Sequence, residues 1–315
     1  MSKKKISVII PCYNEEENIE IAYSEVNREL SKYSEKYDFE IVFEDNGSLD
    51  DSEIILRKLA KQDKNVKVIF NSTNFGPERS ITNLYMRSNG DAIIFFCCDM
   101  QEPPELIPQF IEEWEKGHDI VWGTKTNSNE NAIKYWGRKK YYGLIDKLSD
   151  YKQYHQCIGF GLITAKVRDI VMRQKMQDPE MSIRHIVGQY GFDVKLIPYT
   201  QRERMRGKSS YSFYRYYEFA ISSVCMTSLK PLRYMTIMGI LTAIGCILVS
   251  VFYFVYKLIN WNRFRAGQAP LVIGLFFVTG IMLFCIGILG EYIAILIRRT
   301  TDKPIVVEKE TLNMD

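Results

Sequence analysis

The stretch from Ile93 to Ile107, which reads IIFFCCDMQEPPELI, decides how the first part of the chain folds. An apolar run ends on a single carboxylate, Asp99, and the prolines Pro103 and Pro104 follow shortly after it. A short apolar run bounded by turn residues is typical of a strand that is buried on both faces. Proline is favoured in the first turn of a helix. The stretch therefore predicts a strand, an acidic turn and then a helix.

Similar apolar runs recur along the first two hundred residues or so. They are ISVIIP (6–11), FEIVFED (39–45), VKVIF (66–70), AIIFFCCD (92–99), DIVWG (119–123) and VKLIPY (194–199). Polar segments that favour helices separate the first five of these runs. This alternation predicts an α/β fold with a mostly parallel sheet and helices on both of its faces.

Polar clusters follow three of the predicted strands, at residues 11–18, 44–52 and 97–105. Ligands of parallel sheets bind at the carboxyl ends of the strands. Because these ends lie along one edge of a sheet, we expect the three clusters to meet there and to form the binding site.

The chain has neither a G-x-G-x-x-G nor a G-x-x-x-x-G-K-[S/T] sequence, so the two common glycine-rich phosphate cradles are absent. A nucleotide diphosphate at this edge would need another source of positive charge, which a divalent cation on a strand-end carboxylate provides. Hard oxygen ligands suit Mg²⁺ or Mn²⁺. We therefore expect Asp99 to hold such a metal. The alternative is that Asp99 only caps the following helix.

Two long apolar runs follow a sharp change in composition near Lys230. Neither 234–256 nor 269–290 contains a charged residue. Each run is long enough to cross a hydrocarbon core of about 30 Å, and each has Tyr or Trp near an end, as membrane spans often do. We expect a two-helix transmembrane hairpin with spans at 234–258 and 270–297, rather than two buried helices of a soluble protein.

The first part of the chain is expected to fold in the cytosol. The basic and briefly apolar start, MSKKKISVIIP, is too short for an export signal. The seven cysteines are scattered without a C-x-x-C pair, which is typical of reduced thiols. A net charge of +3 over 315 residues gives no indication of nucleic-acid binding. We expect a multi-pass protein of the cytoplasmic membrane with both chain ends in the cytosol.

Two further segments, 132–148 and 213–229, combine aromatic and apolar residues at helical spacing with basic residues. Such helices beside a membrane hairpin suit docking on the bilayer surface. Ordinary helices that face the protein core are the alternative interpretation for both.

Five motifs in a fixed order resemble glycosyltransferase family 2. They are SVIIPCYNEEENI (7–19), FEDNGSLDDS (43–52), NFGPERSI (74–81), GDAIIFFCCDMQEPPELI (90–107) and GKSSYSF (207–213). With the hairpin, they are most similar to the polyprenyl-phosphate branch, which is related to dolichol-phosphate mannose synthase and to bacterial enzymes that load sugars onto undecaprenyl phosphate. The resemblance implies a GT-A-like fold, a nucleotide-sugar donor with a UDP-sugar favoured, a Mg²⁺ or Mn²⁺ ion, and inverting transfer to a polyprenyl phosphate.

By position, the resemblance also assigns roles to individual residues. It implies donor binding by Pro11, Tyr13, Glu15, Asp45, Asn46, Cys98 and Asp99, metal binding by Asp99 and Gln101, and acceptor-phosphate binding by Arg204, Arg206, Lys208 and Ser209. Of these residues, Asp99, Arg204 and Lys208 would carry catalysis. Attraction of the three basic residues to anionic lipid headgroups is the alternative for that loop.

The chain departs from the family pattern at three places. Asp45-Asn46 stands where the family usually has two acids, and Cys97-Cys98-Asp99 stands where it usually has Asp-x-Asp. The family's Gly-Asp-Phe-Arg is replaced by GFGL at 159–162. One metal-site carboxylate is therefore missing, and Cys97 would be a poor ligand for a hard cation.

A phosphate acceptor lowers the demands on the catalyst. Its oxygen is already an anion at neutral pH, so positioning and neutralisation of the leaving diphosphate would be sufficient. Two alternatives remain open: a catalytically impaired relative that acts as a membrane-bound binding or scaffold subunit, and a polysaccharide synthase, although the Q-x-x-R-W segment of such synthases is absent.

Together these observations divide the chain into four parts. We expect a cytosolic GT-A domain at 1–209, an interfacial amphipathic helix at 210–230, the hairpin at 231–299 and a cytosolic tail at 300–315. The expected partners are a nucleotide-sugar, a polyprenyl phosphate and the bilayer, with no nucleic acid; a homo-oligomer stays open. The expected product is a lipid-linked monosaccharide for modification of cell-envelope glycans.

Overall fold

The chain divides into two compact units in the computed structural model, which describes residues 3–126, 156–177, 181–202, 230–259, 268–300 and 304–314 and the single positions 143, 146, 149, 151 and 154. The sheet unit comprises residues 1–143, 151–210 and 302–315, and the hairpin unit comprises 144–150 and 211–301. The predicted interfacial segments lie outside the described residues, apart from positions 143 and 146. So does the helix predicted at 210–230, apart from its last residue.

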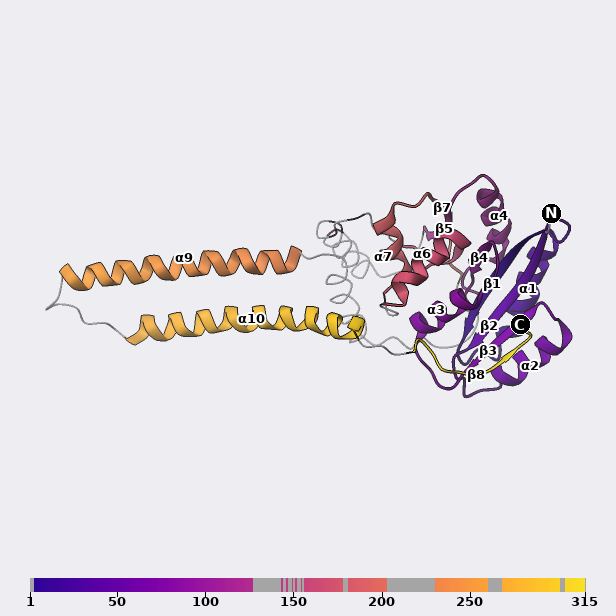
Figure 1. Cartoon of the computed structure of the whole chain (residues 1–315), viewed down its shortest axis with the longest axis horizontal. Helices are drawn as coiled ribbons and strands as arrows, with labels where there is room; N and C mark the ends of the chain where they lie inside the picture. Colours follow the sequence, from indigo (N-terminus) through magenta and orange to yellow (C-terminus); the bar gives the residue numbers. More distant parts are fainter. Residues whose placement is uncertain are drawn as a thin grey trace. The chain divides into compact units, whose positions relative to one another are not determined.

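An eight-stranded sheet forms the centre of the sheet unit (Figure 1). Its strands are β1 (Lys4–Cys12), β2 (Tyr37–Asp45), β3 (Val66–Asn71), β4 (Ala92–Phe95), β5 (Ile120–Lys125), β6 (Gly161–Thr164), β7 (Val194–Tyr199) and β8 (Glu308–Leu312). Their order across the sheet is β7-β5-β6-β4-β1-β2-β3-β8. The six strands that the sequence predicts all point the same way, whereas β6 and β8 are antiparallel to their neighbours. The sheet is therefore mixed.

Helices cover both faces of this sheet. The described helices of the unit are α1 (Ile19–Ser31), α2 (Ser52–Gln62), α3 (Pro77–Arg87), the 3₁₀ turn η1 (Pro104–Leu106), α4 (Ile107–Glu115), α6 (Ala165–Lys175) and α7 (Ile183–Tyr190). Buried residues of α1, α2 and α4 share one apolar cluster, and those of α3, α6 and α7 share the other. The predicted alternation of strands and helices is confirmed.

The buried residues of the central strand β1 explain why the sheet has two apolar faces. Ile6, Val8 and Ile10 belong to one cluster, while Ile9 belongs to the other. This follows from the two-residue period of a strand, which sends successive side chains to opposite faces. An uninterrupted apolar run is needed only where both faces are covered.

The unpredicted strand β6 sits between β4 and β5. It begins at Gly161, whose φ is +143°, and a Cβ atom at this position would lie 2.2 Å from the carbonyl oxygen of Val121. Only glycine allows the neighbouring backbone to approach this closely. The glycine is thus what lets an antiparallel strand enter an otherwise parallel part of the sheet.

The second unpredicted strand, β8, corrects the expectation of a separate tail at 300–315. Residues Glu308 to Leu312 pair with β3 at the end of the sheet. Arg57 forms an ion pair with Glu310, and the Asn313 side chain donates to the carbonyl oxygens of Ala60 (2.7 Å) and Val66 (2.8 Å). The sequence EKETL is polar because this edge strand is partly exposed, so it lacks the apolar run that marks the other strands.

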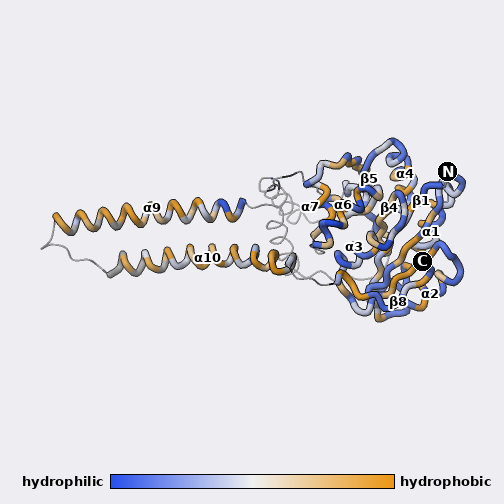
Figure 2. Tube along the Cα trace, viewed as in Figure 1, coloured by the Kyte–Doolittle hydropathy of each residue, from blue (hydrophilic) through white to orange (hydrophobic). Residues whose placement is uncertain are grey.

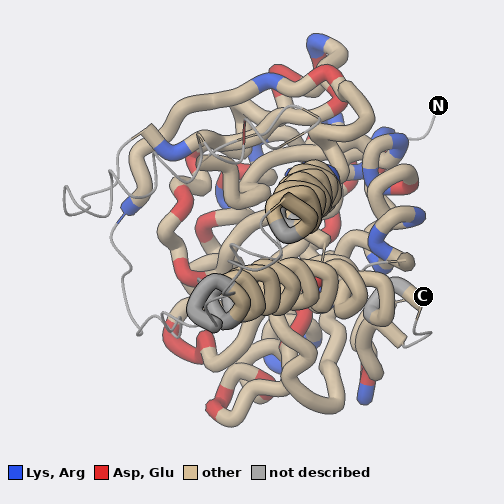
Figure 3. The backbone as a smooth tube through the Cα atoms, turned by 90° about the vertical axis from the view of Figure 1, so that its left-hand side faces the viewer, with Lys and Arg blue, Asp and Glu red and all other residues tan. Residues whose placement is uncertain are grey.

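The hairpin unit contains the two long apolar helices that the sequence predicts, α9 (Lys230–Ile259) and α10 (Gln268–Thr300). Figure 2 shows that apolar residues cover both helices over most of their length, and Figure 3 shows how few charged residues they carry. Two segments, Lys230–Tyr256 and Phe277–Ile297, are long and apolar enough to cross a membrane.

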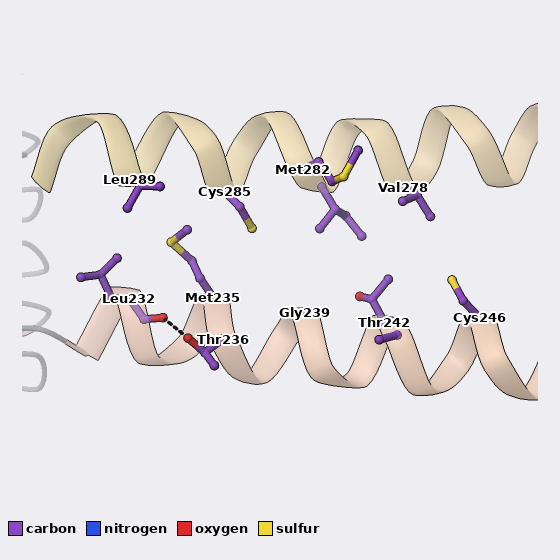
Figure 4. Close-up of a pocket in the computed structure, with 12 residues that line it drawn as sticks. Leu232, Met235, Thr236, Gly239, Thr242, Cys246, Val278, Met282, Cys285 and Leu289 are labelled. Atoms are coloured by element: carbon purple, nitrogen blue, oxygen red, sulfur yellow. Dashed lines mark hydrogen bonds between the residues drawn. The ribbon is translucent and has the colours of Figure 1, made fainter. Parts of the chain in front are cut away.

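A cavity of about 580 Å³ lies between α9 and α10. Figure 4 shows Leu232 and Met235 of α9 pointing toward Cys285 and Leu289 of α10. The lining is almost entirely apolar, with Thr236 and Thr242 as its hydroxyl-bearing members, and both hydroxyls donate to carbonyl oxygens of their own helix.

Two buried glutamates of β2 differ in their surroundings. Burial raises the pKa of Glu44 to about 8, although the side chains of Asn71 and Asn83 donate hydrogen bonds to it. Burial also acts on Glu40, but Lys5, Ser7 and the backbone N–H of Asn89 outweigh it, and the pKa of that carboxyl is lowered. Glu44 is therefore a neutral acid near pH 7, and Glu40 is an anion.

We expect the stability of a Glu44→Gln variant, relative to the unaltered protein, to improve as the pH rises from 5 to 8. Between its usual pKa of 4.5 and its folded pKa of about 8, Glu44 holds a proton that the unfolded chain has lost. The free energy of unfolding of the unaltered protein therefore falls through this window. Tryptophan fluorescence of the full chain in detergent gives the Tm at each pH.

Glu40→Gln is the matched control on the same strand. Because the pKa of Glu40 is lowered in the folded protein, the stability that this carboxylate contributes is present above its usual pKa and is lost only at lower pH. This variant should lower the Tm by a similar amount at pH 5 and pH 8. A pH-independent Tm difference for Glu44→Gln would show that Glu44 is ionised in the folded protein.

Candidate active site

The three polar clusters that follow β1, β2 and β4 meet at one edge of the sheet, as the sequence predicts. The backbone N–H of Asn46 donates to the carbonyl oxygen of Cys12 at 2.9 Å, which joins the ends of β2 and β1. The N–H of Phe96 donates to Ile9 at 3.0 Å, which continues the pairing of β4 with β1. Backbone hydrogen bonds thus fix the spacing of the candidate site.

The turn after β1 lies against the turn after β2. Backbone N–H groups of Asn14 and Glu15 donate to the hydroxyls of Ser48 (2.9 Å) and Ser52 (3.0 Å). Asn14 has a φ of +55°, and its side chain accepts from the N–H of Leu49 at 2.8 Å. These bonds leave the predicted donor-binding residue Tyr13 exposed at the edge, with 42% of its surface accessible.

Asp45 is buried at the end of β2, directly opposite Cys12 in the strand pairing, and the predicted donor residue Pro11 lies opposite Glu44. One oxygen of Asp45 accepts hydrogen bonds from the backbone N–H (3.0 Å) and the hydroxyl of Ser48. Burial raises the pKa of this carboxyl, and the bonds from Ser48 counteract the effect. The side chain therefore shapes the turn after β2.

The amide of Asn46 is fully occupied inside the protein. Its oxygen accepts from the Asn71 side chain (3.2 Å) and the N–H of Phe75 (3.1 Å). Its nitrogen donates to the side-chain oxygen of Asn74 (3.2 Å) and the carbonyl of Gly76 (3.3 Å). An amide has two N–H donors and an oxygen with two lone pairs, so nothing is left for a ligand. We therefore infer that the Asn46 side chain does not contact the nucleotide-sugar directly.

Asp99 lies on a tight turn after β4 that exposes alternate residues. Asp99 and Gln101 are partly exposed, whereas Cys98, Met100 and Glu102 are buried. Met100 has a φ of +57°, and Asp99 accepts a hydrogen bond from the N–H of Gln101 at 3.3 Å. The next helical turn begins at Pro104 with Pro103 as its N-cap, so the alternative interpretation of Asp99 as a helix cap is wrong.

The two cysteines beside Asp99 have different positions. Cys98 is 3% exposed and belongs to the apolar core, so its side chain cannot contact a donor at the edge. Cys97 is partly exposed, on the same side of the alternation as Asp99. Desolvation of its sulfur, together with the negative charges of Glu102 and Asp99, raises its pKa well above the usual value. Its soft sulfur would be a poor substitute for the family's carboxylate as a ligand for a hard cation.

The end of β7 is fastened to the Asp99 turn. The Gln201 side chain donates to the side-chain oxygen of Gln101 at 3.1 Å, and the N–H of Arg202 donates to the Gln101 carbonyl at 2.9 Å. The Arg202 guanidinium contacts both oxygens of Glu105 at 3.0 Å. The basic residues Arg204, Arg206, Lys208 and the neighbouring Ser209 lie outside the described residues, but their loop starts from this anchored point.

Three residues at this edge were not predicted from the sequence: Glu102, Tyr199 and Lys125. Glu102 is 1% exposed and accepts a hydrogen bond from the Tyr199 hydroxyl at 3.5 Å. Burial and the charge of Asp99 raise the pKa of Glu102 to about 7, and Lys125 partly offsets this. Lys125, at the end of β5, is half-buried, and its ammonium has no hydrogen bond or ion pair with the described residues. The strand-end rule that identified Asp99 would have identified Lys125 as well.

The GFGL segment lies at the same edge, because β6 is antiparallel to β4 and its first residue pairs with Phe95. The N–H of Gly123 donates to the Phe160 carbonyl at 2.8 Å. From α7, the Arg184 guanidinium donates to the carbonyl of Cys157 at 2.9 Å. The loop before β6 is thus held beside the Asp99 turn without the acid and arginine that the family carries there.

The side chains at Asp99 fit a hard divalent cation only in part. The carboxylate of Asp99 and the amide oxygen of Gln101 are suitable oxygen donors. Within the described part of the chain, no group of three or more His, Cys, Asp and Glu side chains could enclose a metal ion. A cation here would have few protein ligands, with phosphate oxygens and water completing its coordination.

Comparison with known families matches both units. The model of glycosyl transferase family 2 matches residues 7–173, which is more than half of the chain. A second model, the GtrB C-terminal hairpin, matches residues 230–296 and so covers most of α9 and α10.

Curated relatives align over almost their full lengths. The prophage bactoprenol glucosyl transferase homolog of Escherichia coli K12 is 31% identical over 95% of this chain and 97% of that protein. The bactoprenol glucosyl transferase of Shigella phage SfX is 30% identical over 95% and 97%. The uncharacterized glycosyltransferase YkcC of Bacillus subtilis is 30% identical over 98% and 94%.

Two solved structures share part of the fold at low identity. Glucosyl-3-phosphoglycerate synthase from Mycobacterium tuberculosis, in complex with Mn²⁺, UDP and phosphoglyceric acid, has a TM-score of 0.48 and 15% identity over 71% of this chain and 77% of that chain. Staphylococcus aureus TarS 1–349 with UDP-GlcNAc has a TM-score of 0.45 and 17% identity over 71% and 66%.

We expect Asp99→Asn to abolish tight binding of Mn²⁺ in the presence of UDP. The substitution removes the only carboxylate of the proposed ligand set, and a neutral amide attracts a divalent cation far less. Cys97→Asp should act in the opposite direction and lower the Mn²⁺ concentration needed. Electron paramagnetic resonance of free Mn²⁺ measures both effects on the full chain.

Asp91→Asn is the control for these variants, because Asp91 lies just before the other end of β4 and is exposed. It should leave Mn²⁺ binding unchanged. Equal Mn²⁺ affinity for Asp99→Asn and the unaltered protein would remove Asp99 from the metal site, and an unchanged titration for Cys97→Asp would show that Cys97 does not face it.

Proposed function

The chain belongs to glycosyltransferase family 2, and from this premise we propose that it transfers a sugar from a nucleotide-sugar to a polyprenyl phosphate at the surface of a membrane. The product would be a polyprenyl-phosphate-linked monosaccharide. The carrying observation is that one chain joins the Asp99 edge of the sheet unit to a hairpin that matches the GtrB C-terminal hairpin. Relatives named bactoprenol glucosyl transferases align across both parts.

The donor would bind along the turns after β1 and β2. Tyr13 is exposed there, and Pro11, Glu15 and Asp45 border the same edge. We propose a nucleoside diphosphate sugar, with UDP favoured, whose base and ribose lie against these turns. β1 lies between β2 and β4 in the sheet. A diphosphate that extends from the turn after β2 across the end of β1 would therefore reach Asp99.

Asp99 and Gln101 would hold a divalent cation beside the diphosphate. When bound, the cation would neutralise the charge that develops on the departing nucleoside diphosphate. Gln201 keeps the Gln101 side chain in place, and Arg202 fastens the turn through Glu105. These contacts preorganise the site, so that the turn need not rearrange when the donor binds.

The acceptor phosphate would attack the sugar from the side opposite the leaving diphosphate, which gives inversion. No described side chain needs to remove a proton, since the phosphate oxygen is already an anion. Lys125, together with Arg204, Arg206, Lys208 and Ser209, would position the acceptor. Burial and the charge of Asp99 raise the pKa of Glu102 to about 7, so a part of this acid is protonated near pH 7 and its negative charge beside these phosphates is reduced.

The lipid part of the acceptor requires apolar surroundings. The cavity of about 580 Å³ between α9 and α10 is lined by apolar side chains. The outer surface of both helices is also largely apolar. The hairpin therefore offers the polyprenyl chain a compatible environment near the membrane. This supports a lipid acceptor over a water-soluble sugar acceptor.

The test of this function is a transfer assay with the full chain in membranes. Radiolabelled UDP- and GDP-sugars are supplied with undecaprenyl phosphate and Mg²⁺ or Mn²⁺, and lipid-extractable label is measured. Metal-dependent transfer to the lipid is expected for at least one donor. Donor binding without transfer or hydrolysis for any sugar would favour the alternative of a membrane-bound scaffold subunit.

In that assay, the variants Arg204→Ala and Lys208→Ala should both stay in the membrane fraction. The rate of sugar transfer to the lipid should fall by about a hundredfold in each. Removing a charged group that binds the reacting phosphates in a water-poor site commonly costs about 3 kcal/mol, whereas a surface charge near anionic lipid contributes about 1 kcal/mol. The hairpin alone anchors the protein.

Donor binding should change by no more than a few-fold in both variants. Arg57→Ala is the matched control, because it removes a cation of α2 that pairs with Glu310 of β8. This variant should keep the transfer rate of the unaltered protein. Normal transfer by the two loop variants would limit that loop to contact with lipid headgroups. The acceptor site would then have to lie around Gly159 to Leu162.

We also propose that both chain ends lie on the cytosolic side, because the nucleotide-sugar is made there. A tag inserted in the connection between α9 and α10 should then be labelled from outside intact cytoplasmic membranes. A tag after residue 315 should be labelled only once the membrane is opened. The reverse pattern of labelling would overturn this topology.

A further inference from the structure

The turn after β2 is connected to the C-terminal strand by a chain of polar side chains, most of which are buried. Its members are Asn46, Asn71, Glu44, Asn83 and Glu308, which belong to the turn after β2, to β3, to β2, to α3 and to β8. The first four are between 0% and 7% exposed. Buried polar groups that are hydrogen-bonded help to hold a structure in one arrangement, and each of these side chains takes part in at least one such bond.

Two amides act as the bridges of this chain. The Asn71 nitrogen donates to Glu44 at 2.6 Å and to the Asn46 oxygen at 3.2 Å. The Asn83 nitrogen donates to the other oxygen of Glu44 at 3.1 Å and to Glu308 at 3.0 Å. Each bridge uses both hydrogens of one amide, so neither can move without breaking two bonds. Arg87, 3.2 Å from Glu308, completes the far end.

The near end of the chain holds the loop between β3 and α3. Asn46 contacts three successive residues of it, Asn74, Phe75 and Gly76. Gly76 has a φ of +87° and is the N-cap of α3. The backbone of this loop also packs tightly on the turn, because a Cβ atom on Gly47 would lie 2.7 Å from the Thr73 carbonyl carbon.

We propose that Asn46 is a positioning residue of the donor pocket, that it fixes loop 73–76 as one wall of that pocket, and that β8 supports this wall through the polar chain. The inference rests on the proposed function, since it takes the turn after β2 as the donor site. It assigns a role in nucleotide binding to a strand that follows the membrane hairpin in sequence.

The chemistry of residue 46 explains why an amide stands where the family usually has an acid. A carboxylate only accepts hydrogen bonds, and the atoms that face the Asn46 nitrogen, on Asn74 and Gly76, are acceptors too. An acid at this position would place oxygen against oxygen at two contacts. The amide is therefore matched to the loop 73–76 of this chain.

The test compares the full-length protein in detergent with Asn46→Asp, Glu308→Ala and Glu310→Ala. Glu310 is the matched control, because it lies on the same strand but pairs with Arg57. Calorimetric titration with UDP and with GDP, each with Mn²⁺, gives the nucleotide Kd. Hydrogen exchange of the peptide that contains residues 73–76 reports on the loop without any nucleotide.

We expect Asn46→Asp to weaken nucleotide binding by about tenfold and Glu308→Ala by about threefold, because one or two buried hydrogen bonds are broken. Both variants should speed exchange in loop 73–76, and Glu310→Ala should change neither quantity. In the transfer assay, the donor KM should rise while the acceptor KM and the kcat stay within about twofold. A purely structural role would instead lower the Tm without this split.

Unaltered nucleotide affinity and unaltered loop exchange in Asn46→Asp would overturn the inference while leaving the proposed function intact. Faster exchange with unaltered affinity would overturn the assignment of the loop as a pocket wall. If the unaltered protein binds neither nucleotide, the proposed function itself fails, and the positioning role fails with it.

Discussion

The pairing of β1 with both β2 and β4 is the constraint on which the rest of the site depends. These are parallel pairings, so their backbone hydrogen bonds bring the ends of three strands to one edge at a fixed spacing. The turn with Asp45 and the turn with Asp99 lie on either side of the end of β1. The end of β7 and the loop before β6 are attached to this edge, so the spacing of the three strand ends also fixes their positions.

The distribution of charge at the edge follows from burial. Burial raises the pKa of Glu44 to about 8 and that of Glu102 to about 7, so both acids are at least partly protonated near pH 7, whereas Asp99 remains partly exposed. An active edge that receives several phosphate groups benefits when its interior acids carry little charge, because each unpaired buried anion would repel them. Burial thus reduces the charge of these two interior acids, while Asp99, the carboxylate that we propose as a metal ligand, stays partly exposed.

Sequence patterns revealed the parts of the fold that depend on apolar periodicity. The six parallel strands, the helices between them and the convergence at Asp99 all follow from buried runs and strand-end polarity. The strand β6 escaped detection because its entry depends on a close backbone approach at Gly161. The polar edge strand β8 carries no such run. The contacts of Asn46 with loop 73–76 could not be predicted, because the partners of a side chain are set by tertiary contacts rather than by residue type.

The position of β8 in the chain has a consequence for the order of biosynthesis. Residues 308–312 are translated after both hairpin helices, yet they occupy the place beside β3. Until these residues are synthesised, β3 presents an unpaired edge, and Glu308 is absent from its place beside Asn83. The direction of translation alone therefore makes completion of the sheet unit a late event, which follows the synthesis of both hairpin helices.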